Sequence, residues 1–224
     1  MDEPQEISVK LPVPEAKPVA LDPARTVLVI VDMQYDHCKP NGPKPYNPRR
    51  EAVIAPIHDL LQRCRAGGAP VIYVQSLRDP DDPEFAVFGT RPYVLRGTHG
   101  ADIVDELAPL PGEPVIEKNS HDPFRGTALE RVLAERGIVP IDWTVIVAGL
   151  GLANCVGCAI AGFSVRNYWV VVPMDCTASR AWEDDVVQYQ RWMGSAWSHN
   201  VTLTRSELVT LAGARQGAGT LAQA

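Results

Sequence analysis

The chain of 224 residues has no apolar run longer than a single β-strand and no cluster of basic side chains. A membrane-spanning helix needs about 20 consecutive apolar residues, so we expect no segment that crosses a membrane. The 21 Lys and Arg are outnumbered by 27 Asp and Glu, for a net charge of −6, whereas a nucleic-acid-binding protein is typically basic. The acidic start Met-Asp-Glu-Pro-Gln-Glu lacks the apolar core of a secretory signal. These features disfavour membrane and nucleic-acid partners.

The sequence is also poor in cysteine and lacks nucleotide-binding motifs. Its five cysteines are an odd number, which does not suit a disulfide framework in a chain of this size. Reduced thiols are typical of the cytoplasm, where we expect the protein. No Gly-x-Gly-x-x-Gly follows the first predicted strand, and no phosphate-loop lysine motif occurs. We therefore predict no cofactor.

Apolar segments of strand length alternate along the chain with segments of helical period. The predicted strands are residues 26–31, 70–75, 114–118, 145–148, 168–173 and 201–204. Such alternation is typical of a parallel sheet with helices on both faces. The predicted fold class is α/β, a three-layer αβα architecture with a mainly parallel, Rossmann-like sheet of six strands. We place this domain at residues 26–212, after a Pro-rich arm (1–25) and before a flexible tail (213–224).

The stretch of residues 143–158 ends a predicted strand at two glycines and opens a helix near Cys155. A thiol among the unpaired N–H groups of a helix start is expected to have a lowered pKa. Asp32 and Lys118 each end another predicted strand, and functional groups of open α/β sheets gather at this edge. Taken alone, Asp32 could instead cap a turn and Lys118 could form a structural salt bridge.

Three ordered motifs then resemble those of the isochorismatase-like cysteine hydrolases. They are Val-Ile-Val-Asp-Met-Gln-x-Asp at 29–36, a Lys before Phe-x-Gly-Thr-x-Leu at 118–129, and Gly-x-x-x-x-x-Cys-Val at 149–156. The resemblance implies that Cys155 is a nucleophile forming a thioester, Asp32 the general base and Lys118 the cation between them. It also implies an oxyanion hole from the backbone N–H groups of Leu152 and Cys155, beside a cis peptide between Gly151 and Leu152.

The resemblance further implies a small amide, carbamoyl or ureido substrate whose C–N bond is hydrolysed. Nicotinamidases of this superfamily carry metal-binding histidines after the second strand, but here residues 75–80 contain none, so we predict a metal-independent enzyme. Small-residue helix faces and the arm favour a homodimer or homotetramer. The candidate substrate-binding residues are Tyr35, Arg91, Tyr93, His121, Phe124 and Asn154.

Two other functions remain open at this point. Cys155-Val-Gly-Cys158 is a C-x-x-C motif at a helix start, as in thiol-redox proteins. The vinyl-ether-cleaving isochorismatases are the other alternative, although they lack the cysteine. Leu152 also departs from the resemblance, because many members have Thr there.

Overall fold

The computed structural model describes residues 10–40, 42–43, 45–89, 91–194 and 198–212. Its main sheet has the strand order β4 (Val115–Lys118), β3 (Val71–Ser76), β2 (Thr26–Val31), β5 (Thr144–Leu150), β6 (Trp169–Pro173) and β8 (Val201–Thr204). All these strands pair in parallel. The two-residue strand β7 (Thr177–Ala178) pairs with the end of β5 and makes the sheet seven-stranded. The predicted parallel α/β fold is thus confirmed, with one short strand added.

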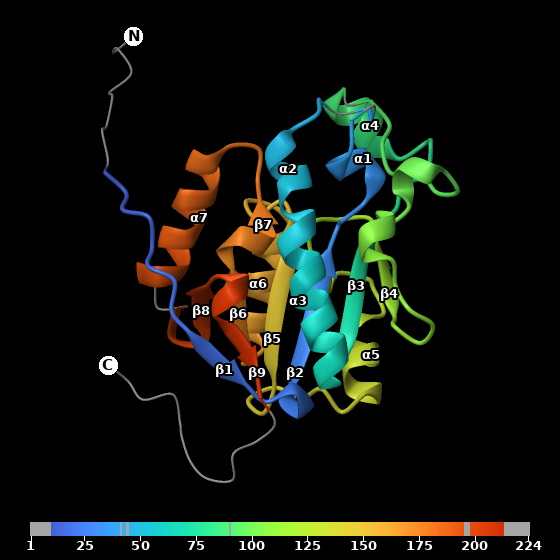
Figure 1. Cartoon of the computed structure of the whole chain (residues 1–224). Helices are drawn as coiled ribbons and strands as arrows, with labels where there is room; N and C mark the ends of the chain where they lie inside the picture. Colours follow the sequence, from blue (N-terminus) through green and yellow to red (C-terminus); the bar gives the residue numbers. More distant parts are fainter. Residues whose placement is uncertain (1–9, 41, 44, 90, 195–197, 213–224) are drawn as a thin grey trace.

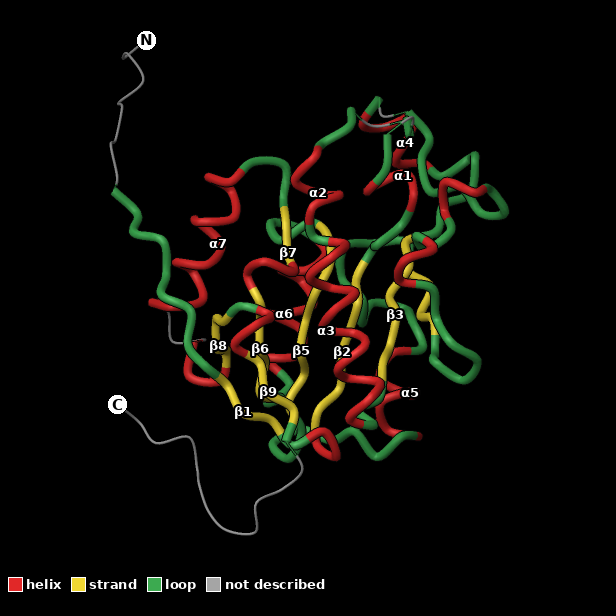
Figure 2. The backbone as a smooth tube through the Cα atoms, in the orientation of Figure 1, coloured by secondary structure: helices red, strands yellow, loops and turns green. Residues whose placement is uncertain are grey.

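Helices form the two outer layers of the molecule. Helix α3 (Ile54–Gly67) packs on one face of the sheet, and α5 (Leu129–Glu135), α6 (Cys155–Val165) and α7 (Trp182–Gly194) pack on the other (Figure 1). Figure 2 shows the strands between these layers. Three shorter helices lie near the carboxyl ends of the central strands, namely α1 (Tyr35–Cys38), α2 (Pro48–Ala52) and α4 (Pro83–Phe88).

The period of two in the strands explains why the sheet is buried on both faces. In β2, Val27 and Val29 belong to the core shared with α5, α6 and α7, whereas Leu28 and Ile30 belong to the core shared with α3. All four side chains are at most 1% exposed. Successive strand residues point to opposite faces, so a strand apolar at every position fits a central place in the sheet.

Part of the predicted N-terminal arm is built into the fold of its own chain. Strand β1 (Val19–Leu21) pairs in parallel with β9 (Val209–Leu211) in a separate two-stranded sheet. Just before it, the Lys17 N–H donates to the Leu203 carbonyl (3.1 Å). Residues 206–211 form a 3-10 turn followed by β9. The domain therefore includes residues ahead of position 26, while the predicted tail lies outside the described residues.

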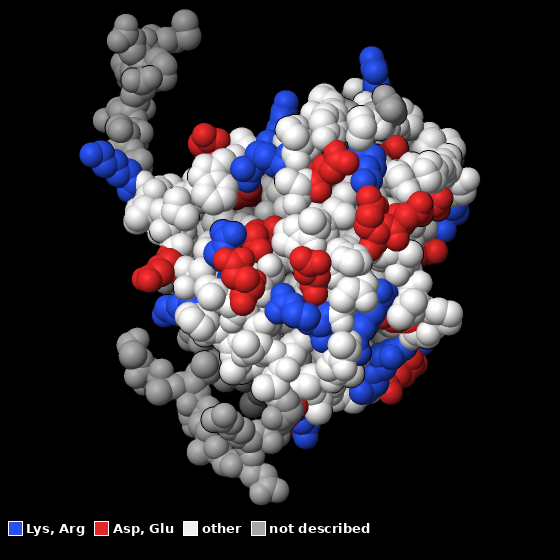
Figure 3. All heavy atoms as spheres, in the orientation of Figure 1, with Lys and Arg blue, Asp and Glu red and all other residues white. Residues whose placement is uncertain are grey.

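The surface carries charges of both signs. In the face shown by Figure 3, Lys and Arg are mixed with Asp and Glu, without a continuous basic region. Within the described ranges, no helix is long and apolar enough to span a bilayer.

Candidate active site

Asp32, Lys118 and Cys155 meet at the carboxyl edge of the sheet. Asp32 follows β2, Lys118 ends β4 and Cys155 is the first residue of α6. The Lys118 Nζ lies 2.8 Å from Asp32 Oδ2 and 3.3 Å from Cys155 Sγ. The side chains of Lys118 and Asp32 are only 1% and 3% exposed. The three residues singled out by sequence thus form one buried cluster.

Ser76 joins this cluster, although sequence reasoning did not identify it. Strand β3 lies between β2 and β4, so its last residue, Ser76, lies beside both Asp32 and Lys118. Its Oγ accepts from Lys118 Nζ (2.6 Å) and donates to Asp32 Oδ1 (3.0 Å). Its backbone N–H also donates to Asp32 Oδ1 (3.1 Å). Ser76 therefore fixes the orientation of both charged groups.

Gln34 holds Ser76 in place. Its Oε1 accepts from the Ser76 N–H (3.0 Å), and its Nε2 donates to the carbonyls of Ser76 and Ala101 (both 2.7 Å). Gln34 is fully buried. Asp32 itself has φ +54°, in the left-handed region that non-glycine residues seldom adopt. Such a backbone is retained where surrounding contacts determine it, and the Ser76 hydrogen bonds are contacts of that kind.

The buried ion pair keeps both of its members charged. Burial alone would raise the pKa of Asp32, but Lys118 and further hydrogen bonds hold the pKa of this carboxyl below its ordinary value. Burial alone would lower the pKa of Lys118, but Asp32 raises it above the ordinary value. A carboxylate next to the cysteine is therefore available as a proton acceptor at neutral pH.

The thiol of Cys155 is held in its protonated form. Burial is the largest influence and the Asp32 carboxylate the second, and together they raise the pKa of Cys155 although Lys118 acts in the opposite direction. The lowered pKa predicted from the helix start is therefore wrong for this structure. Burial and a neighbouring carboxylate outweigh the helix dipole, whose influence is modest. A thiolate at Cys155 would therefore require a proton acceptor, and the Asp32 carboxylate is the nearest candidate.

His121 also contacts the thiol of Cys155. Its Nδ1 lies 3.2 Å from Cys155 Sγ. Burial, and then the nearby Lys118 charge, lower the pKa of His121, so the ring is neutral at pH 7. A neutral imidazole adds no positive charge to the cluster, and it can share a proton with the sulfur.

The turn before Cys155 is held close to β2 and β7. Gly149 has φ +123°, and a Cβ there would lie 2.0 Å from the Val31 carbonyl oxygen, so only glycine fits. The Leu152 N–H donates to the Ala178 carbonyl (3.3 Å), and the Ala153 N–H donates to Ser179 Oγ (2.7 Å). These bonds fix the position of the nucleophile-bearing turn.

The predicted cis peptide between Gly151 and Leu152 is not found. The described residues contain no cis peptide bond, so this bond is trans. The N–H of Leu152 is used by the Ala178 carbonyl and does not complete an oxyanion hole in this arrangement. The N–H of Cys155, by contrast, has no acceptor among the described residues, as expected for the first residue of a helix.

Asp185 braces the same turn from helix α7. Its buried carboxylate accepts from the Ser179 N–H (2.7 Å) and pairs with Arg49 (2.6 Å). Ser179 in turn holds Ala153. Although hydrogen bonds from Ser179 and Arg49 oppose it, burial raises the pKa of Asp185. Helix α2 is therefore connected to the turn before Cys155 through the carboxylate of Asp185 and the hydroxyl of Ser179.

A cavity of about 130 Å³ opens onto Cys155. This volume is small beside the ~300–1,000 Å³ of pockets for drug-sized ligands. Two predicted substrate-binding residues, His121 and Asn154, line it. The other lining residues are Asp32, His37, Arg50, Leu150, Gly151 and Cys155. His37 of α1 and Arg50 of α2 were not among the predicted contacts.

The other four predicted substrate-binding residues do not line this cavity. Phe124 packs edge-on against Phe163 in the core (centroids 4.9 Å apart). Tyr35 stacks on His99, Tyr93 donates to Glu84 (3.0 Å), and Arg91 is exposed. A motif-adjacent aromatic is as easily a core residue as a pocket wall, and position in the sequence did not distinguish the two.

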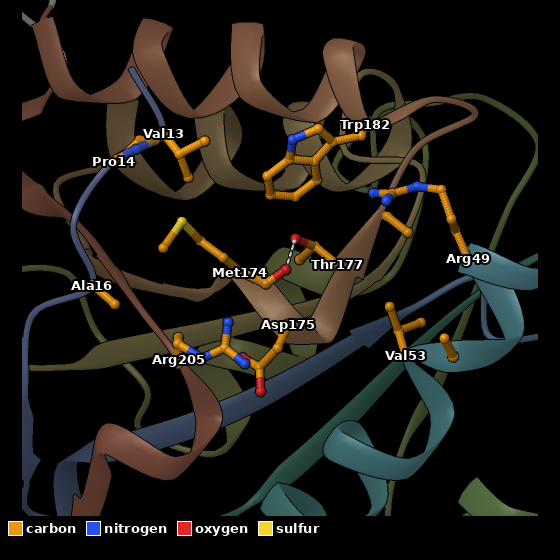
Figure 4. A pocket seen from close by; sticks show the side chains of 12 residues that line it. Val13, Pro14, Ala16, Arg49, Val53, Met174, Asp175, Thr177, Trp182 and Arg205 are labelled. Atoms are coloured by element: carbon orange, nitrogen blue, oxygen red, sulfur yellow. Dashed lines mark hydrogen bonds between the residues drawn. The ribbon is translucent and has the colours of Figure 1, made fainter. Parts of the chain in front are cut away.

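A larger cavity of about 360 Å³ is lined in part by Arg49 and Ala52 of α2 (Figure 4). There the guanidinium of Arg49 lies 5.2 Å from the centre of the Trp182 ring. Val13 and Pro14 of the N-terminal segment form another wall. None of the three predicted catalytic residues lines this cavity, which is therefore distinct from the catalytic one.

Neither a metal centre nor a disulfide occurs within the described part of the chain. No group of three or more His, Cys, Asp or Glu there could hold a metal ion. Both members of the C-x-x-C motif, Cys155 and Cys158, are free thiols, as are the other three cysteines. Burial also raises the pKa of Cys158, which disfavours the thiolate that disulfide exchange requires.

Comparisons with known proteins agree on one family. The model described as Isochorismatase domain matches residues 26–197. The ureidoacrylate amidohydrolase RutB of Methylobacterium radiotolerans is 28% identical over 187 residues, which cover 72% of this chain and 70% of that protein. The crystal structure of N-carbamoylsarcosine amidase from Thermoplasma acidophilum superimposes with a TM-score of 0.69 at 30% identity, covering 82% of this chain and 97% of that one.

A nicotinamidase shares the fold at lower sequence identity. The crystal structure of nicotinamidase PncA from Bacillus subtilis gives a TM-score of 0.69 at 21% identity, with 80% of this chain and 99% of that chain covered. This likeness concerns the fold alone.

Proposed function

The chain belongs to the isochorismatase family, and we propose that within it this protein is a metal-independent cysteine hydrolase. Its substrate is a small amide, carbamoyl or ureido compound, and the reaction cleaves a C–N bond through a thioester. The observation that carries the proposal is the buried cluster of a carboxylate, an ammonium and a thiol, of which the carboxylate and the thiol line one small cavity. Relatives named as amidohydrolases support the choice of bond.

The first half of the reaction transfers the acyl group to sulfur. Asp32 accepts the Cys155 proton while the sulfur attacks the substrate carbonyl carbon, forming the S–C bond and a tetrahedral oxyanion. The protonated Asp32 then gives this proton to the leaving nitrogen as the C–N bond breaks. Because the thiol is protonated at rest, proton transfer and attack belong to the same step. The products are an acyl or carbamoyl thioester and free ammonia or amine.

The second half regenerates the thiol. Asp32 accepts a proton from a water molecule while the water oxygen attacks the thioester carbonyl carbon. As the C–S bond breaks, Asp32 returns the proton to the sulfur of Cys155. Lys118 remains charged throughout and stabilises both the carboxylate and the developing negative charge on sulfur. The free N–H of Cys155 at the start of α6 supplies an oxyanion donor.

The two alternatives have less support. A redox role would require a reactive thiolate at one end of the C-x-x-C motif, yet burial raises the pKa of both Cys155 and Cys158. A vinyl-ether hydrolase would have no use for a cysteine between an ammonium and a carboxylate. The acyl-transfer mechanism uses every member of the cluster.

The test compares wild type with Cys155→Ala on a panel of primary amides, N-carbamoyl acids and simple ureas, reading ammonia release. We expect release by the wild type, unchanged after dialysis against EDTA, and a loss of at least about 10³-fold in Cys155→Ala. Trapping of the acyl enzyme, seen as a mass increase on Cys155, would identify the thioester. Ammonia release that survives in Cys155→Ala would refute the mechanism.

Two further proposals concern assembly and compartment. We propose a homodimer or homotetramer, and we propose the cytoplasm as its compartment, supported by five free thiols. Light scattering coupled to size-exclusion chromatography would measure the assembly, and a monomer across the concentration range would refute it.

A further inference from the structure

Arg50 places a positive charge on the wall of the catalytic cavity. It lies on α2, is half-buried, and lines the cavity beside Asn154 and Cys155. Burial, together with the nearby Arg180, lowers the pKa of Arg50, but an arginine stays charged in proteins. Among the residues that the structure describes, no carboxylate lies within 4 Å of its guanidinium.

The contrast with neighbouring charged residues makes this arrangement specific. Arg49, the preceding residue, is paired with Asp185 at 2.6 Å. Glu51, the following residue, pairs with Lys39 at 3.4 Å and also accepts from Tyr46. Each neighbour of Arg50 on this helix is therefore engaged in the fold, whereas Arg50 points its charge at the cavity.

The charges of the cavity do not cancel without a ligand. The charge of Lys118 is matched by Asp32, its partner at 2.8 Å, and His121 is neutral at pH 7. Arg50 is thus left as an unmatched cation in a partly desolvated site, where an opposite charge is favoured. This local positive charge stands against a net charge of −6 for the whole chain, so it is not a general property of the protein.

We infer that Arg50 binds an anionic group of the substrate, most simply a carboxylate. The guanidinium offers a planar pair of donors that matches a carboxylate in a bidentate fashion. The cavity is small, so the carboxylate and the scissile carbonyl belong to one short molecule, such as an N-carbamoyl or ureido acid of few carbon atoms. This inference rests on the proposed function, since it names the substrate class of the same site.

The helix that carries Arg50 is held in place by its own contacts. Asn47 caps its start through the Arg49 N–H (3.0 Å), and its Nδ2 donates to the Arg180 carbonyl (2.7 Å). At the other end, Lys39 links Glu51 to Glu106. A cation on such an anchored turn can select among substrates without reorganising the cavity.

Alkylation of Cys155 tests the inference without any need for turnover. Iodoacetate and iodoacetamide differ chiefly in the negative charge, so the ratio of their rates at Cys155 reports the cation near the thiol. We expect Arg50→Gln to lower the iodoacetate-to-iodoacetamide ratio by about 10- to 100-fold, with the iodoacetamide rate within about threefold of wild type. Arg50→Lys should retain most of the ratio, because it keeps the charge.

Arg131→Gln is the matched control. It removes one positive charge from an exposed position on α5, where Arg131 pairs with Glu135, and should leave the ratio unchanged. A ratio that falls equally in both variants would mean that overall charge is responsible. An unchanged ratio in Arg50→Gln would overturn the inference.

Hydrolysis separates this inference from the proposed function. N-Carbamoylglycine and propylurea have similar lengths, but only the first carries a carboxylate. We expect wild type to favour the acid in kcat/KM, and Arg50→Gln to lose about 10- to 100-fold on the acid while propylurea changes by less than threefold. Equal hydrolysis of both ureas, indifferent to Arg50, would overturn the inference and leave the hydrolase intact. No hydrolysis of any panel compound, with the alkylation ratio still dependent on Arg50, would overturn the proposed function and support the anion site.

Discussion

Replacing Lys118 by Met tests how the buried ion pair is maintained. Met has a similar length and no charge, so the change removes the cation while approximately preserving the packing. It leaves the Asp32 carboxylate, 3% exposed, with the neutral groups of Ser76 and Cys155 as partners. A carboxylate without a counter-charge in this position is costly, because burial favours its neutral form.

The magnitude follows from the geometry. At 2.8 Å, the gross attraction between the two charges is about 6 kcal/mol for an effective dielectric constant of about 20. Removing one partner of a buried pair typically costs about 3–5 kcal/mol, because the other charge stays behind. We expect Lys118→Met to lose free energy of unfolding in this range at pH 7.5.

The pH dependence of the variant should be opposite in sign to that of wild type. In wild type the folded-state pKa of Asp32 is lowered, so its contribution is present above the unfolded-state pKa and is lost as pH falls through the folded-state pKa. Without Lys118 the folded-state pKa is expected to rise above the unfolded one. The variant then becomes more stable as pH falls through that raised pKa, by up to about 1.4 kcal/mol per pH unit.

Urea unfolding at pH 7.5 and pH 5.5 measures both effects. The double variant Lys118→Met, Asp32→Asn provides the control, since it removes the stranded charge and should recover part of the loss at pH 7.5. A stability loss that is the same at both pH values, together with no recovery in the double variant, would refute the account of a charged pair.

Two predictions concern the nucleophile and its turn. Because burial and Asp32 raise the pKa of Cys155, the rate of its labelling by iodoacetamide should keep rising to at least about pH 10, beyond the ordinary thiol pKa of about 8.5; a plateau below pH 8 would show a preformed thiolate instead. Gly149→Ala should lower the free energy of unfolding by more than about 3 kcal/mol in urea titrations, because a Cβ would lie 2.0 Å from the Val31 carbonyl oxygen. Gly89→Ala is the control, since its φ is also positive but nothing lies within 4 Å, and an equal loss in the two variants would contradict the steric explanation.

The parallel sheet could be predicted because its main strands have a recognisable apolar pattern in the local sequence. Residues 27–31 are apolar at every position, and the structure buries all five. The two-residue strand β7 and the three-residue strand β9 carry no such pattern and exist only because neighbouring strands are in place. The break between α2 and α3 at Val53 could not be predicted either, because apolar residues continue at helical spacing across this position.

The core of the site could also be predicted, whereas its supporting residues could not. Asp32, Lys118 and Cys155 lie at ends of elements, where sequence alone can place them. Ser76 acquires its role from the strand order, which puts β3 between β2 and β4, and Arg50 acquires its role from the return of a loop. The prediction of a lowered pKa for Cys155 was wrong for a similar reason, because burial depends on the tertiary structure and cannot be inferred from a local helix start.

The adjacent arginines of α2 divide two tasks between neighbouring positions. Arg49 is tied through Asp185 and Ser179 to the turn before Cys155, whereas the Arg50 guanidinium lines the cavity and has no carboxylate within 4 Å among the described residues. During divergence from a common ancestor, an exchange at position 50 could therefore change the preferred substrate in a single step and leave the reactive frame intact. An exchange at position 49 would instead disturb the position of the turn before Cys155. The two positions should therefore evolve under different constraints, although they lie on the same helical turn.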